Sequence, residues 1–171
     1  MAEQAPSPLT LWRRFTALYA RALEIALVAS VALLVFPVTM QVISRFTNLF
    51  PHYIWTEEMA RFQFIWMVMI GATVGVREAS HFEVDVWPIL SRRAEAGVRI
   101  LSRVGVLALA AIFIIAGAEF TRFALNRTSE LAELPLWLIH VAWPLAGLSW
   151  IVFLGEQFLD ELRIIWRGEP A

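Results

Sequence analysis

The sequence between Ile54 and Asp85 places its charges at the two ends of an apolar stretch, and this layout constrains the fold more than any other feature. From Phe62 to Val76 there is no charged residue, while acids and arginines crowd both flanks. An amphipathic helix of a soluble protein would instead carry its polar residues along one side. The stretch is therefore expected to be a helix that crosses a membrane, with charges near both surfaces.

The composition extends this conclusion to the whole chain. With 171 residues, 59% of them hydrophobic, and a mean hydropathy of +0.64, the chain is too apolar for an ordinary soluble domain and too long for a single anchor. The net charge is near neutral and no basic run is interleaved with aromatics, so nothing indicates nucleic-acid binding. The absence of Cys excludes disulfides, thiolate nucleophiles and iron–sulfur ligation. We expect one integral membrane domain over residues 1–171.

Four apolar segments predict four transmembrane helices. A span needs roughly 20 residues, and the second and third uncharged runs are shorter, so they must draw in their flanks. The residues Arg61, Arg77, Arg103 and Glu119 then lie at the membrane boundary, where long arginine side chains reach the polar surface. Pro37 and Pro144 are expected to bend their helices without ending them. The expected spans are about 22–44, 57–77, 99–122 and 135–156.

Two further segments have the pattern of helices that lie in the headgroup plane. From about 9 to 20, apolar residues recur at helical spacing, which fits an interfacial helix or, equally well, the first turns of the next span. The connection at about 78–98 shows a similar pattern, with Pro88 as its weakest point. The predicted fold is thus an all-α membrane protein with four transmembrane helices and short interfacial amphipathic helices.

The distribution of arginine predicts the orientation in the membrane. Arginines before the first span, around the 78–98 connection and after the last span outnumber those on the opposite side. Under the positive-inside rule both termini and this connection are expected in the cytoplasm. Trp55 and Trp137 then fall at the outer boundary, as expected for aromatic belts, and the loops at 45–56 and 123–134 face outward.

Charged residues within the expected spans require an explanation, because each costs on the order of 3 kcal/mol on insertion scales. Glu24, Arg61 and Glu119 are such residues. They would be proton or ion sites, or else groups near the boundary that pair with opposite charges. We expect pairing, because none lies at the middle of its span. The expected partners are Arg21 or Arg77 for Glu24, and both Glu58 and Glu119 for Arg61.

The histidines give weaker indications of chemistry. His52 and His140 are expected at similar depth, which leaves a haem-ligand pair open as an alternative. His81 stands near Asp85 and other acids, an arrangement that fits a metal cluster or a solvated helix face. No paired general acid and base, nucleophile elbow, phosphate-binding glycine loop or zinc spacing is present. We therefore expect no enzyme activity, no cofactor and no metal site.

A GxxxG pattern, Gly71 to Gly75, lies in the second span. Small residues at this spacing let helices approach closely, either within one chain or between chains. Because the chain has only four expected spans and no evident polar cavity, we expect it to pack against another membrane protein, with lipid around the rest.

The second span and the connection after it resemble a known family. Trp55, Glu58 and Arg61 form W-x-x-E-x-x-R; the span then carries Gly71, Gly75 and Arg77, followed by an H-x-x-V-D motif that contains His81 and Asp85. This combination is similar to the small (Q-type) membrane subunit of tripartite ATP-independent periplasmic (TRAP) transporters. Size, number of spans and expected topology agree over roughly residues 10–165.

The resemblance implies a subunit of a secondary transporter in the bacterial inner membrane. In such systems a periplasmic substrate-binding protein delivers an organic anion, commonly a carboxylate, to a large membrane subunit driven by a sodium gradient. The small subunit would then be a rigid scaffold for the large one. Two alternatives remain open at this point: a cytochrome b-type membrane anchor that binds haem, and a stand-alone four-span exporter that uses Glu24.

Overall fold

The computed structural model describes residues 8–47, 55–78 and 92–167, and the elements in these ranges are helices. Four helical stretches are long and apolar enough to cross a membrane: Leu11–Phe46, Trp55–Glu78, Gly97–Ala124 and Trp137–Leu159. This confirms the predicted all-α membrane fold. The helices are α1 (Pro8–Phe46), α2 (Trp55–Glu78), α3 (Arg92–Ala124), α4 (Trp137–His140) and α5 (Ala142–Arg167).

α1 is one uninterrupted helix that contains the segment 9–20. The segment is therefore continuous with the helix of the first span. Pro37 lies inside α1 without ending it. Most of the 78–98 connection lies outside the described residues, and its end, from Arg92, already belongs to α3.

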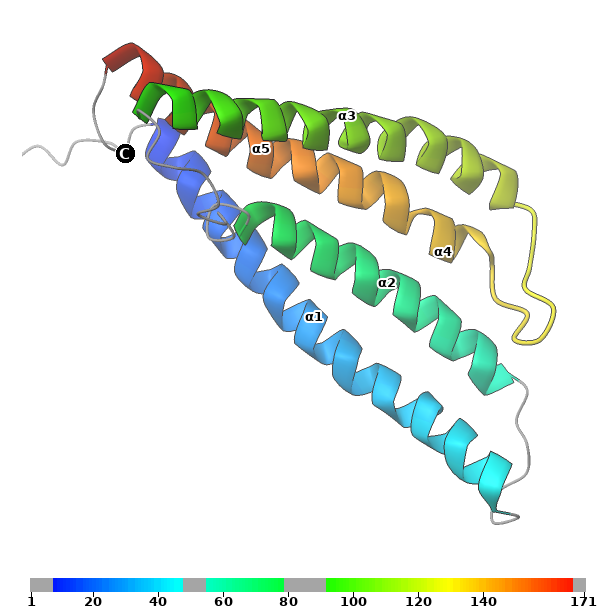
Figure 1. Ribbon diagram of the computed structural model, residues 1–171. Helices are drawn as coiled ribbons and strands as arrows, with labels where there is room; N and C mark the ends of the chain where they lie inside the picture. The colour runs from blue at the N-terminus through cyan, green and yellow to red at the C-terminus, as the bar shows by residue number, and fades with distance from the viewer. Residues whose placement is uncertain (1–7, 48–54, 79–91, 168–171) are drawn as a thin grey trace, which may run out of the picture.

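The fourth span differs from the expectation that Pro144 would bend its helix without ending it. It is divided into α4 and α5 by one residue, Val141, which keeps helical backbone angles (φ −65°, ψ −21°). Proline has no N–H to donate to the carbonyl four residues earlier, here that of His140. Helical bonding is already re-established at Leu145, whose N–H donates to the Val141 carbonyl at 3.2 Å. The interruption is local, and the two helices continue in nearly one direction (Figure 1).

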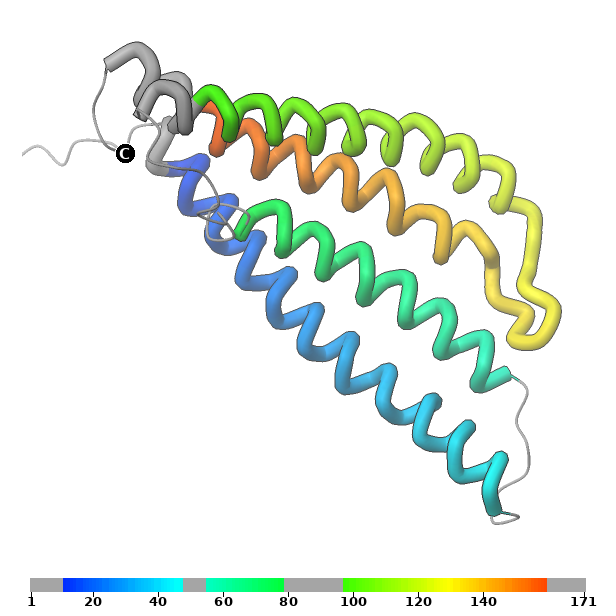
Figure 2. The backbone as a smooth tube through the Cα atoms, viewed as in Figure 1, coloured from blue at the N-terminus to red at the C-terminus, as the bar shows by residue number. Residues whose placement is uncertain are grey.

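The helices form a fan in which α2 lies between α1 and the α4–α5 pair, and α3 lies on the far side of α5 (Figure 1). In the described part of the chain, no Cα atom of α2 lies within 8 Å of a Cα atom of α3. The helices are close together where α1 begins and spread toward its other end, as the backbone trace shows (Figure 2). At the narrow end Tyr19 of α1 reaches α5, where it stacks on Phe153 at 5.6 Å between ring centroids.

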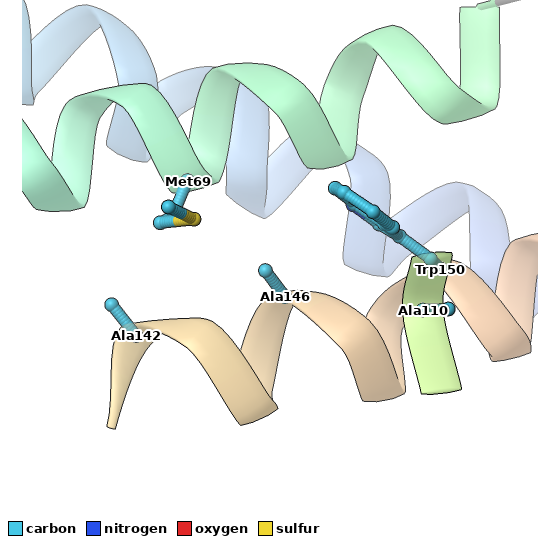
Figure 3. Packing of buried hydrophobic residues seen from close by; sticks show 5 residues of the cluster. All are labelled: Met69, Ala110, Ala142, Ala146 and Trp150. Atoms are coloured by element: carbon cyan, nitrogen blue, oxygen red, sulfur yellow. The ribbon is translucent and has the colours of Figure 1, made fainter. Parts of the chain in front are cut away.

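The buried core joins α2, α3 and α5 through small residues and one large aromatic (Figure 3). Ala142 and Ala146 of the fourth span face Met69 of α2, and Ala110 of α3 is fully buried. The indole Nε1 of Trp150 donates to the Thr73 hydroxyl at 3.2 Å. Small side chains allow the close approach that helices in membranes use in place of a hydrophobic driving force.

The closest glycine-mediated approach is between α3 and α5, and the GxxxG motif is not part of it. A Cβ on Gly147 would lie 2.7 Å from the Ala110 carbonyl oxygen, and one on Gly117 would lie 2.7 Å from Cδ of Pro144. By contrast, a Cβ on Gly71 would meet only Leu27 of α1, at an ordinary 3.6 Å, and Gly75 has nothing within 4 Å. Within this chain, Gly75 therefore makes no close helix contact.

Candidate functional site

The first candidate site is the loop anchor, which consists of Glu58 and residues 129–132 of the loop between α3 and α4. Glu58 is only 8% exposed. Its carboxylate accepts hydrogen bonds from the backbone N–H groups of Leu131 at 3.1 Å and Ala132 at 2.6 Å. Its position in the first turn of α2 also favours a negative charge, because of the helix dipole. The anchor ties the start of α2 to the loop that joins two other spans.

The loop that Glu58 holds has a regular structure of its own. The Ser129 N–H donates to the Leu134 carbonyl at 2.8 Å, and the Leu134 N–H donates to the Ser129 hydroxyl at 3.2 Å. Glu133 turns the chain with a positive φ of 52°. Buried backbone groups need such hydrogen-bond partners, so these bonds stabilise a defined loop conformation. The side chains of Glu130 and Glu133 are exposed on this loop.

The predicted pairing of Arg61 with Glu119 is wrong. Arg61 and Glu119 are both exposed and form no ion pair, and the α4–α5 pair separates their helices. The carboxylate of Glu58 is hydrogen-bonded to the loop amides, and the nearby positive charge of Arg61 interacts with it electrostatically without a direct ion pair. Trp55, at the start of α2, is 46% exposed. Of the outer cluster expected from the sequence, only Glu58 has a buried role within this chain.

The second candidate site is the Arg77 cluster, where a chain of contacts links all four spans at the end of α2. Arg77 Nη1 donates to the Thr16 carbonyl of α1 at 2.6 Å, and its guanidinium lies 5.6 Å from the centre of the Phe153 ring. The Gln157 amide of α5 donates to the Arg77 carbonyl at 3.3 Å and to the Val76 carbonyl at 3.0 Å. These are last-turn carbonyls of α2, which have no partner within their own helix.

α3 joins the Arg77 cluster through Arg103, whose Nη1 donates to the Gln157 carbonyl at 2.8 Å. The packing is tight here, since Thr16 is 0% exposed and Phe153 only 1%. Arg77 and Arg103 were expected at the boundary only because of their length and charge. In the structure they set the relative heights of the four spans.

The other predicted residues make fewer contacts. The expected pairing of Glu24 is wrong: Arg77 is bound to Thr16, and Glu24 and Arg21 are both exposed without an ion pair. His140 stacks on Phe120 with 5.9 Å between ring centroids. His52, His81 and Asp85 lie outside the described residues, so the haem pair and the metal cluster were not tested. Across 8–47, 55–78 and 92–167, no three His, Asp or Glu side chains gather as a possible metal site.

Sequence reasoning missed the polar contacts between the spans. Besides Gln157 and the Thr73–Trp150 bond, Tyr19 and Ser149 share a hydrogen bond of 2.6 Å between α1 and α5, and the Trp66 indole donates to the Leu138 carbonyl at 2.9 Å. The sequence did contain a signal for these contacts, namely polar side chains within apolar spans, because such a side chain usually bonds to a partner on a neighbouring helix. Which partner it finds depends on the order of the helices.

Comparison with known proteins agrees with the resemblance of the second span. One relative, 28% identical over 85% of this chain, is an isethionate TRAP transporter permease protein, DctMQ, of Oleidesulfovibrio alaskensis. A second, 36% identical over 55% of this chain, is a C4-dicarboxylate TRAP transporter small permease protein, DctQ, of Rhodobacter capsulatus. The chain spans 24% of the length of the first and 43% of the second.

A third relative, from Haemophilus influenzae, is named provisionally as a TRAP transporter small permease protein. It is 28% identical over 87% of this chain and 92% of its own length. Residues 34–164 match the family described as tripartite ATP-independent periplasmic transporters, DctQ component. That range includes the loop anchor and the residues of the Arg77 cluster that lie outside α1. The chain therefore belongs to the DctQ-component family of TRAP transporters.

Proposed function

We propose that the chain is a small scaffold subunit that supports a large membrane subunit, which imports an organic anion, commonly a carboxylate, with a sodium gradient and a periplasmic binding protein. Membership of the family makes it a transport component of the inner membrane and not an enzyme. The observation that supports a scaffold is that the buried polar groups of the chain bind to its own helices and loops. In the loop anchor and the Arg77 cluster they connect helices to one another.

The relatives support the remaining parts of the proposal. The DctMQ protein is much longer than this chain, which matches 24% of it, so a region similar to this chain occurs there within a larger permease. The names of two relatives mention isethionate and C4-dicarboxylate, which are both small organic anions. They differ in the charged group, a sulfonate against carboxylates, although the matching regions are similar. We infer that the substrate is selected by other subunits.

Co-expression tests this function. The tagged chain, produced together with a large TRAP membrane subunit of the same organism, should retain that subunit through purification in mild detergent. In proteoliposomes, sodium-driven uptake of the anion should require both subunits and the binding protein, and should vanish when the sodium gradient is removed. Sodium-dependent uptake by this chain alone would contradict the scaffold function. A Soret absorption band in the purified chain would favour the cytochrome alternative.

A further inference from the structure

Glu24 is an exposed carboxylate on α1 that lies beyond the Arg77 cluster, on the side of the apolar segments. The cluster gives a common level for all four spans, because Thr16, Arg77, Gln157 and Arg103 are joined by consecutive hydrogen bonds. A helix rises about 1.5 Å per residue, so Glu24 lies roughly 12 Å beyond Thr16 along α1.

The packing of α1 on α2 supports this depth. Leu27, one turn after Glu24, lies beside Gly71 in the uncharged stretch of α2. Arg77, which ends the uncharged stretch of α2 on this side, comes six residues after Gly71, and α1 and α2 run in opposite directions (Figure 1). Glu24 therefore lies about one helical turn farther into the apolar segments than the backbone of Arg77.

Nothing in the described part of the chain compensates the charge of Glu24. Arg21, one turn earlier, is exposed and makes no ion pair with it. An arginine can extend along the helix to the polar surface, but a glutamate side chain is too short to cover roughly 12 Å. The side chains around Glu24 are apolar and exposed, with Ile25 at 71% and Val28 at 70%.

A lipid tail does not satisfy such a group. Hydrocarbon offers no hydrogen-bond donor, and the amines of lipid headgroups stay at the polar surface. A transmembrane helix can place a donor at any depth, and charged groups in membranes usually pair within a protein interior. The exposed carboxylate thus indicates that a partner helix with a basic or hydrogen-bond-donating side chain covers this position.

We propose that the Glu24 face of α1, formed by Arg21, Glu24, Ile25 and Val28, is covered by a transmembrane helix of the large membrane subunit that presents a basic or hydrogen-bond-donating side chain to Glu24. This inference rests on the proposed function and adds the surface and the charge by which the two subunits recognise each other. α2 occupies a different face of α1, the one that carries Thr16, Ala20 and Ser30, all of which are buried.

Photo-crosslinking in the assembled complex tests the contact while Glu24 stays in place. A benzoylphenylalanine residue in place of Val28 should capture the large subunit on illumination. The same probe in place of Ile115 of α3, which is 66% exposed, measures random capture from a comparably open position. A band from position 28 that is no stronger than that from position 115, or capture of lipid alone, would overturn the inference.

A charge reversal tests the chemistry. Glu24→Lys should lower the amount of large subunit retained per chain by at least about tenfold, as expected when one member of a desolvated charge pair is replaced. Glu24→Gln should lower it less. Glu119→Lys makes the same charge change at an exposed position of α3 that belongs to neither candidate site, and serves as the matched control. Equal retention by Glu24→Lys and Glu119→Lys would contradict the proposal.

Failure of the proposed function and failure of the Glu24 contact give different experimental results. If the unmodified chain does not retain the large subunit, the proposed function is wrong. If it retains the subunit while the probe at position 28 captures no more than the control, only the location on α1 is wrong.

Discussion

Glu58 and Arg61 show how neighbouring charges on one helix acquire different roles. Glu58 lies on the side of α2 that faces the α3–α4 loop, where two backbone amides donate to it. Arg61, three residues later, is on the exposed side of the same helix. A carboxylate that accepts two N–H groups in a buried position is hard to replace, whereas an exposed charge contributes little to stability.

Substitutions at these two positions should therefore differ in effect. Glu58→Ala removes the acceptor of the Leu131 and Ala132 amides, so hydrogen exchange at those amides should become at least about tenfold faster. Glu58→Gln, which keeps one acceptor oxygen, should have a smaller effect. Arg61→Ala should change the free energy of unfolding by less than about 1 kcal/mol. Exchange measured by mass spectrometry in detergent checks this; unchanged protection in Glu58→Ala would contradict the role of the anchor.

Helix pairing in this fold depends on where small residues meet a facing backbone. α3 and α5 approach most closely at Gly117 and Gly147. The GxxxG motif of α2, which was the more visible pattern in the sequence, has no close contact at Gly75. A motif of small residues permits close packing, but only the facing helix makes use of it.

Alanine substitutions distinguish these glycines. Gly147→Ala would place a Cβ 2.7 Å from the Ala110 carbonyl oxygen and 2.9 Å from Cγ1 of Ile114. Overpacking of this kind costs about 1–3 kcal/mol, so the purified chain should unfold at a lower temperature. Gly75→Ala should not lower it, because the added methyl meets nothing within 4 Å. Equal destabilisation by both substitutions would show that the motif packs within the chain.

The four spans form a fan, and the contacts that join all four of them lie at its narrow end. The Arg77 cluster joins four spans there, and the loop anchor connects α2 to the α3–α4 loop at the other end. Among the described residues, the far part of α1 packs against α2 alone, and large apolar side chains along it, such as Leu33 and Phe36, are exposed. Such a surface requires lipid or a partner subunit around it.

The orientation of the fan remains a prediction from the arginine distribution. A reporter fused after Arg167, or inserted near Arg92, should be found in the cytoplasm, and one inserted near Phe50 should be periplasmic, because arginine-rich flanks are retained inside. Paired alkaline phosphatase and green fluorescent protein fusions at each position measure this. A periplasmic C-terminus would overturn the arrangement.

The sequence by itself determined the number and approximate position of the spans, and it did so for a physical reason. Hydrocarbon thickness acts on consecutive residues, so a run of apolar side chains with charged ends is sufficient to predict a crossing helix. The family resemblance was also contained in the sequence, since it depends on residues at short spacing such as Trp55, Glu58 and Arg61.

Only the tertiary structure decided the lateral order of the helices, and the misplaced contacts between helices follow from that order. The fourth span lies between α2 and α3, so Arg61 cannot meet Glu119, and Arg77 meets Thr16 and Phe153 in place of Glu24. A hydropathy pattern does not predict which apolar helices become neighbours, because lipid tails are as apolar as the helix faces themselves. Their neighbours are selected by backbone approach at Gly117 and Gly147 and by polar contacts such as Tyr19 with Ser149, which join residues far apart in the chain.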